Sequence, residues 1–377
     1  MAGIYIHIPF CKKACHYCNF HFSTNLSGKN EMVRALLSEI EMQQHYLEHQ
    51  TIDTIYFGGG TPSLLHAQEL KLILDSVNKY YKLSSTLKEI TLEANPDDIS
   101  IEKVLAWKKI GINRLSIGIQ SFFEEDLVFM NRGHNASQAA QCIKIAQDGG
   151  ISNLSIDLIF GFPLLSDEKW RYNVDRVLEF KVPHVSCYGM TVEPKTALAS
   201  FIEKGKMMPL DEEQSASQYE YLMHTLILSG FEQYEISNFA LPGFEAVHNS
   251  NYWSGQHYLG IGPSAHSYNG VSRQWNVANN AKYMKSISQG ELVRELENLT
   301  RPQQINEIIM VQLRTSKGLD MKQVYDLMSL DEVAIFHQQV EVLKLQHHLI
   351  ELNQQLKLTP SGKLIADYIS SMLFIDM

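Results

Sequence analysis

Three cysteines within eight residues near the start of the chain are the feature that most restricts what this protein can be. The segment Phe-Cys-Lys-Lys-Ala-Cys-His-Tyr-Cys places Cys11, Cys15 and Cys18 at C-x3-C-x2-C spacing. Thiolates are preferred ligands of iron–sulfur clusters, and three of them leave one iron of a four-iron cluster without a protein ligand. Structural zinc usually takes four ligands in two separated pairs, so the spacing favours a cluster with one open coordination site.

Strand-like and helix-like segments alternate along the first two-thirds of the chain. Helical periodicity is found at 30–49, 136–146 and 167–180. Segments rich in β-branched or aromatic residues, each predicted as a strand, are found at 4–8, 54–57, 90–94, 114–119, 154–159 and 184–189. Repeated strand–helix units predict a parallel sheet with its functional residues at the carboxyl ends of the strands. The cysteine segment directly follows the first predicted strand.

The pattern changes after residue 194. Helices are predicted at about 211–229, 299–313, 321–328, 336–346 and 360–373, with a short hairpin at 348–358. Residues 234–280 are rich in Gly, Asn, His and aromatic residues, which predicts loops. We therefore expect an α/β barrel-like domain over residues 1–235, a loop-rich extension over 236–298 and a winged-helix-like α domain over 299–377.

Cysteine usage and hydropathy predict a cytoplasmic protein. Five cysteines in 377 residues are too few for a disulfide scaffold, and Cys142 and Cys187 stand alone in apolar segments, where they are predicted to be buried. The first residues alternate like a strand and lack the pattern of a signal peptide. No run of about 18 apolar residues occurs, so no transmembrane helix is expected.

A winged-helix-like tail raises the alternative of a regulator that binds nucleic acid. The net charge of the chain is −10, and residues 301–377 hold seven basic and nine acidic side chains. Nucleic-acid phosphates require clusters of Lys and Arg. We therefore expect no nucleic-acid partner, and a packing or partner-docking role for the tail.

Polar residues follow several of the predicted strands. The glycines in Phe-Gly-Gly-Gly-Thr-Pro at 57–62 allow a ligand to approach the backbone closely, although such a run also occurs in simple tight turns. Glu93 and Arg132 could bind a ligand, and each also fits a solvated surface position. Asp157 lies within an apolar strand and needs a polar partner, which favours a functional role.

The cysteine spacing, with Tyr17 before the last cysteine, resembles the signature of the radical SAM family. The resemblance implies a partial (β/α)6 TIM-like barrel in which the open iron binds the amino and carboxylate groups of S-adenosylmethionine (SAM). In that family the reduced cluster cleaves SAM to a 5′-deoxyadenosyl radical. The SAM contacts implied by the resemblance are Tyr5, Tyr17, Gly59, Gly60, Thr61, Glu93, Gln120, Arg132 and Asp157.

Longer motifs at 186–194 and 234–240 resemble one branch of that family, the oxygen-independent coproporphyrinogen III oxidases and the radical SAM heme chaperones. The oxidases carry another cysteine two residues after the third cluster cysteine, where this chain has Phe20. They also carry an extension before the first strand, which here begins within the first few residues. In both features this chain resembles the chaperones rather than the oxidases.

The segment Val-His-Asn-Ser-Asn-Tyr-Trp at 247–253 resembles the HNxxYW heme-binding motif of the chaperones. Neutral imidazole can ligate heme iron, so His248 is the candidate ligand. Tyr252 and Trp253 could pack on a porphyrin face. A histidine in a loop is also commonly a hydrogen-bonded structural residue, and both interpretations remain open.

The sequence thus predicts a radical SAM-type heme chaperone that binds a 4Fe-4S cluster, SAM and heme, and passes heme to an acceptor protein. Further partners would be an electron donor and, transiently, a membrane. The first alternative is an enzyme that oxidatively decarboxylates coproporphyrinogen III to protoporphyrinogen IX. The second is the non-catalytic nucleic-acid-binding regulator. Whether SAM is cleaved stays open at this stage.

Overall fold

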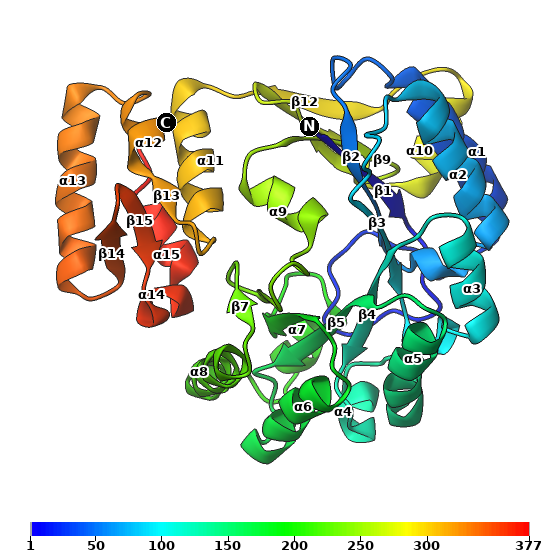
Figure 1. Cartoon of the computed structure of the whole chain (residues 1–377), viewed down its shortest axis with the longest axis horizontal. Coiled ribbons are helices and arrows are strands. Elements are labelled where there is room, and N and C mark those ends of the chain that lie inside the picture. The colour runs from blue at the N-terminus through cyan, green and yellow to red at the C-terminus, as the bar shows by residue number, and fades with distance from the viewer. Residues whose placement is uncertain (1, 377) are drawn as a thin grey trace.

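Six parallel strands form the centre of a curved sheet in the computed structural model, which describes residues 2–376 (Figure 1). They are β1 (Ala2–Ile8), β2 (Ile52–Gly59), β3 (Glu89–Ala94), β4 (Arg114–Gln120), β5 (Asn153–Phe160) and β6 (His184–Gly189). Each pairs in parallel with the next. All six predicted strands are confirmed, and the architecture agrees with the expected partial TIM-like barrel.

Helices on the outer face of the sheet connect these strands (Figure 1). They are α1 (Lys29–Met42), η1 (Pro62–Leu64), α2 (Ala67–Tyr80), η2 (Pro96–Asp98), α3 (Ile101–Lys109), α4 (Glu124–Phe129), α5 (Ala136–Asp148) and α6 (Asp167–Glu179). In α2 the buried residues Leu70, Ile73, Leu74 and Val77 recur every three or four positions, as one apolar helix face requires. The side chains of Asn135 and Ser166 cap α5 and α6.

Residues 236–298 differ from the loop-rich extension that the sequence predicts. They contain β8 (Asn238–Ala240), α9 (Val247–Trp253), β9 (His257–Ile261), β10 (His266–Tyr268), β11 (Ser272–Asn276), α10 (Asn280–Ser288) and β12 (Arg294–Asn298). Strand β9 pairs in parallel with β1, and β10 to β12 continue the sheet antiparallel. The buried residues Leu259 and Ile261 join the barrel core.

The other edge of the sheet is made by β7 (Glu232–Gln233) and β8, after α7 (Ala197–Glu203) and α8 (Glu212–Leu228). The full strand order is β12-β11-β10-β9-β1-β2-β3-β4-β5-β6-β8-β7. Because β12 and β7 do not pair with each other, the sheet is an open, partial barrel.

A buried carboxylate fixes residues 257–288 against the barrel. Glu39 of α1 is fully buried and accepts hydrogen bonds from Tyr283 Oη at 2.6 Å, Gly262 N at 2.7 Å and Asn276 Nδ2 at 2.6 Å. A buried carboxylate is tolerated only when donors surround it. These bonds therefore hold the added strands in place.

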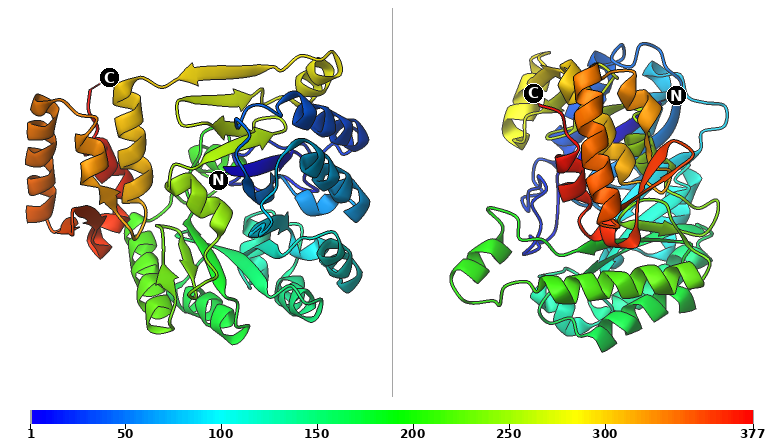
Figure 2. Two further views of the ribbon diagram at one scale, coloured as in Figure 1. Left: turned by 45° about the horizontal axis from the view of Figure 1, so that its top comes forward. Right: turned by 90° about the vertical axis from the view of Figure 1, so that its left-hand side faces the viewer.

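The last residues form a separate module with its own apolar core (Figure 2). It contains α11 (Arg301–Leu313), β13 (Leu319–Asp320), α12 (Met321–Tyr325), α13 (Leu330–Leu345), β14 (Leu349–Leu352), β15 (Gln355–Leu358), α14 (Pro360–Leu364) and α15 (Ala366–Met372). The order helix, strand, two helices and hairpin is that of a winged helix, as expected. No helix within the described residues is long and apolar enough to span a membrane.

Polar contacts join this module to the barrel. Ser316 N donates to Tyr234 O at 3.0 Å, and Lys363 Nζ donates to Gln233 Oε1 at 2.7 Å. The guanidinium of Arg314 lies 5.5 Å from the centre of the Trp253 ring. The module therefore packs against α9 and the β7–β8 edge of the sheet.

Candidate functional site

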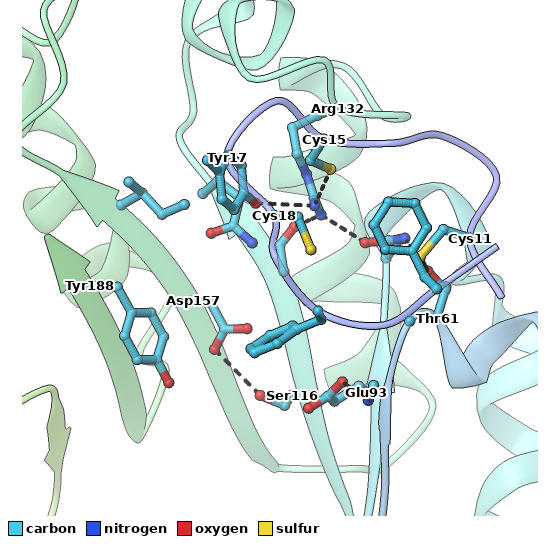
Figure 3. Close-up of a pocket in the computed structure, with 18 of the residues that line it drawn as sticks. Cys11, Cys15, Tyr17, Cys18, Thr61, Glu93, Ser116, Arg132, Asp157 and Tyr188 are labelled. Carbon is cyan, nitrogen blue, oxygen red and sulfur yellow. Dashed lines mark hydrogen bonds between the residues drawn. The ribbon is translucent and has the colours of Figure 1, made fainter. Parts of the chain in front are cut away.

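A cavity of about 420 Å³ extends into the barrel from the carboxyl ends of its strands (Figure 3). The predicted cluster and SAM residues that line it are Cys11, Cys15, Tyr17, Cys18, Gly59, Gly60, Thr61, Glu93, Gln120, Arg132 and Asp157. Tyr5 is the exception. It is stacked on Tyr56, a lining residue, and its hydroxyl bonds to His7 Nδ1 at 3.2 Å.

The three cysteines lie on one loop between β1 and α1, at one side of the cavity, and all three are free thiols (Figure 3). A turn closed by Cys18 N and Cys15 O, 3.3 Å apart, brings these two residues together. Burial raises the pKa of the Cys11 thiol to about 11. Such a thiol stays protonated unless a metal replaces the proton.

The donor set fits an iron–sulfur cluster. Among residues 2–376, no three His, Cys, Asp or Glu side chains converge closely enough to hold a single metal ion. In a cubane each thiolate binds a different iron, so its ligands need not meet at one point. Three thiols on one loop that line one cavity therefore fit the ligand set of a cluster with one open iron.

Arg132 is held beside the cysteines. Its Nη1 lies 3.3 Å from Cys15 Sγ and 3.4 Å from Tyr17 Oη. Its Nη2 donates to Asn95 Oδ1 and to Gly118 O, both at 2.7 Å. Its buried Nε has no partner among the described residues and remains a donor for a ligand. The guanidinium is thus preorganised to bind an anionic group next to the thiols.

Close packing explains the glycines after β2. Gly59 has φ +107°, and a Cβ there would lie 2.5 Å from the His7 ring. A Cβ on Gly60 would lie 2.6 Å from Phe10 O. Thr61 follows and donates from Oγ1 to Cys11 Sγ at 3.5 Å. Only glycine therefore lets this turn pack against β1 and the cysteine loop.

Two carboxylates face the interior of the cavity. Glu93 accepts hydrogen bonds from Tyr56 Oη at 2.8 Å and Gly59 N at 3.2 Å, and burial, aided by the charge of Asp157, raises its pKa to about 8. Ser116 Oγ lies 3.4 Å from Asp157, whose pKa burial raises to about 6. Such groups can accept hydrogen bonds from an ammonium or from ribose hydroxyls.

Gln120 ends β4 in an unusual conformation. Its φ is +68°, and the β4–β5 register shifts between Gly118 and Gln120. A bulge re-aims a side chain, and strained non-glycine residues cluster at ligand sites. Here the bulge places Gln120 at the cavity, where the resemblance had predicted a SAM contact.

The candidate heme residues lie in the short helix α9 rather than in a loop. His248 is 1% exposed, with Nδ1 2.8 Å from Thr54 Oγ1 and Nε2 2.8 Å from Tyr252 Oη. Burial lowers its pKa to about 3, so the imidazole is neutral. Neither ring nitrogen is available to iron in this conformation. Heme ligation by His248 stays a prediction and requires α9 to move.

Helix α9 covers the amino ends of the barrel strands, at the opposite end from the cysteines. Glu89, the first residue of β3, accepts hydrogen bonds from the backbone N–H groups of Val247 at 2.7 Å and His248 at 3.3 Å. Asn249 reaches the cavity from this side. Trp253 packs beneath Arg314, and its buried Nε1 has no hydrogen-bond partner in the described chain.

Some cavity residues were not predicted from the sequence. They are Tyr56, Asn95, Arg114, Ser116, Tyr188 and Asn249. Arg114 and Ser116 alternate with apolar residues in a predicted strand, so the reasoning applied to Asp157 could have found them. Nothing in the local sequence indicates that Asn249 reaches the barrel interior. Cys142 and Cys187 are each 1% exposed, as predicted.

Comparison with protein families gives two matches. Residues 5–177 match the model of the radical SAM superfamily, and residues 299–365 match that of the HemN C-terminal domain. The second match lies within the winged-helix module.

Curated relatives match along most of the chain. The heme chaperone HemW of Bacillus subtilis (strain 168) is 37% identical over 324 residues, covering 85% of this chain and 86% of that protein. The heme chaperone HemW of Lactococcus lactis is 31% identical over 372 residues, covering 99% and 97%. Among solved structures, the coproporphyrinogen III oxidase HemN of Escherichia coli superimposes with a TM-score of 0.84 at 22% identity, over 99% of this chain and 90% of that one. That similarity shows a shared fold.

Proposed function

Because the chain belongs to the radical SAM superfamily and, within it, to the family of the HemW heme chaperones, we propose that it binds heme and passes it to an acceptor protein. The observation that carries this proposal is the similarity to HemW proteins over nearly the whole chain, including the module and α9. Phe20, at the position where the oxidases carry an additional cysteine, supports the chaperone role over the oxidase.

The barrel would hold the cluster and SAM. Cys11, Cys15 and Cys18 would bind three irons, and the bound cluster supplies an electron-transfer centre with one open iron for SAM. Arg132 would position an anionic group beside that site through its unpartnered Nε. Glu93 and Asp157 accept hydrogen bonds deeper in the cavity.

Heme would bind at the other end of the barrel, through α9. Ligation of iron by His248 requires the breaking of its bonds to Thr54 and Tyr252. In the buried position burial keeps the imidazole neutral, and neutral imidazole is the form that ligates iron. Release of α9 would also disturb the contact of Trp253 with Arg314. Heme loading would thus loosen the module from the barrel.

Titration of the anaerobically reconstituted protein with hemin tests this proposal. We expect a saturable shift of the Soret band that is abolished in His248→Ala and retained in His224→Ala, a control at an exposed position on α8. Hemin should then transfer from the loaded protein to a heme-free hemoprotein. Absence of binding, or formation of protoporphyrinogen from coproporphyrinogen III and SAM, would contradict the chaperone role.

A further inference from the structure

Arg114 is a buried arginine that the predicted SAM site does not use. It is the first residue of β4 and only 1% exposed. Within residues 2–376 its Nε has no hydrogen-bond partner. Burial raises the pKa of Glu93 and of Asp157, and the charge of Arg114 partly offsets this rise, but neither carboxylate forms a direct ion pair with it. A buried guanidinium donor without a hydrogen-bond partner is costly, so the free Nε can be satisfied by a ligand that carries an acceptor.

The open side of Arg114 is the cavity. Arg114 lines it together with Ser116, Gly118 and Gln120, which are the inward-facing positions of the same strand. The cavity therefore follows β4 from Arg114 to Gln120, about 20 Å for six steps of roughly 3.3 Å each. The cysteine loop lies at the Gln120 end. Arg114 lies at the other end, beneath the predicted SAM site.

Neighbouring carboxylates act on Arg114 through space but do not occupy its hydrogen-bond donors. Glu93 is bonded to Tyr56 and Gly59, and Asp157 lies beside Ser116. Both groups line the cavity with Arg114, and the Arg114 charge opposes the burial that raises the pKa of each, without a direct ion pair.

The position of α9 indicates what that ligand is. Asn249 follows His248 directly and lines the same cavity as Arg114, at the amino ends of the strands. Glu89, whose carboxylate bonds the first N–H groups of α9, lies in β3 beside β4. A molecule bound through α9 would therefore approach the barrel at the end where Arg114 lies.

We propose that Arg114 binds a carboxylate inside the barrel, and that this carboxylate is a propionate arm of the heme held by α9. This inference rests on the proposed function. A cavity of about 420 Å³ is too small for SAM and a porphyrin macrocycle together, so only an arm of the heme would enter while the macrocycle stays outside. The planar guanidinium can grip a carboxylate through two parallel hydrogen bonds. The methionyl carboxylate of SAM is expected at the far end, beside Arg132.

Hemin and its dimethyl ester distinguish a propionate contact from binding of the macrocycle alone. Both are titrated into the reconstituted wild-type protein with SAM present, followed by the Soret band. We expect hemin to bind at least tenfold more tightly than the ester, as the loss of a charge-assisted bond implies. This comparison needs no variant and is independent of any folding defect.

Variants then assign the contact. Arg114→Gln should lower the affinity for hemin to that of the ester and leave the affinity for SAM unchanged, whereas Arg114→Lys should be intermediate. Arg34→Gln, at an exposed position in α1, is the matched control. Equal binding of hemin and ester by the wild type would overturn the inference but leave heme binding intact. Weakened SAM binding in Arg114→Gln, with hemin unaffected, would assign the carboxylate to SAM and also overturn it. If neither hemin nor its dimethyl ester binds, the proposed function itself is contradicted.

Discussion

The hydrogen bond between Tyr252 and His248 should oppose heme binding, and Tyr252→Phe tests this directly. In the structure Tyr252 Oη lies 2.8 Å from His248 Nε2, in a buried environment. Removal of the hydroxyl leaves that ring nitrogen unsatisfied, which costs about 1–3 kcal/mol. This cost applies only to the conformation described here, in which α9 is closed and His248 is buried. In a heme-bound conformation with α9 displaced, the same nitrogen would bind iron and would not be unsatisfied.

The expected result is a gain in affinity accompanied by a loss of stability. If the closed form is destabilised by about 1.4 kcal/mol, the apparent Kd for hemin falls roughly tenfold, since each tenfold change corresponds to that energy. The melting temperature of the heme-free protein should fall at the same time. Hemin titration and thermal unfolding of the same preparations measure both quantities.

Tyr81→Phe is the matched control. Its hydroxyl donates to Ile40 O at 3.1 Å, is buried, and lies away from α9. This change should lower the melting temperature and leave hemin affinity unchanged. If Tyr252→Phe lowers stability while hemin affinity stays constant or decreases, His248 is not a ligand released by opening of α9, and the reasoning fails.

Three further predictions concern the barrel. Gly59→Ala should lower the free energy of unfolding by about 2 kcal/mol more than Gly205→Ala, because both have positive φ but only Gly59 lacks space for a Cβ; equal stabilities in denaturant unfolding would refute this. Arg132→Met should weaken SAM binding at least tenfold in calorimetry while iron content is retained, and Arg34→Met should not; unchanged SAM affinity would remove Arg132 from the site. Burial raises the pKa of Glu93 to about 8, so the stability that its neutral form contributes is lost as the pH rises through that value. In cluster-free protein, Glu93→Gln should therefore lose less thermal stability than the wild type between pH 6 and pH 9, and equal losses would show that Glu93 does not titrate in this range.

The parallel barrel could be predicted from the sequence because its strands carry strong local signals. The strand Ala2–Ile8 is buried along nearly its whole length and is followed at once by the cysteine loop. Polar residues at strand ends, such as Glu93 and Gln120, meet in one cavity because parallel strands place their carboxyl ends at the same edge. The positions of these residues at the ends of predicted parallel strands were therefore enough to predict that they share one site.

Residues 236–298 could not be predicted, because their structure depends on distant partners. The helix Val247–Trp253 contains residues of low helix propensity, and its first N–H groups are satisfied by Glu89, about 160 residues earlier. The edge strand Arg294–Asn298 is largely exposed and lacks apolar alternation. His248 matched a heme-binding motif, yet only the structure shows that both its ring nitrogens are hydrogen-bonded, to Thr54 and Tyr252, at the amino ends of the strands.

Anaerobic reconstitution with iron and sulfide, followed by addition of SAM, tests most directly the claim that three thiols hold a cluster with one open iron. We expect about four irons and four sulfides per chain and an electron paramagnetic resonance spectrum of the reduced protein that changes when SAM binds. Joint replacement of Cys11, Cys15 and Cys18 by alanine should abolish the absorbance of the cluster. A protein that stays free of iron after reconstitution, or a spectrum that SAM leaves unchanged, would contradict it.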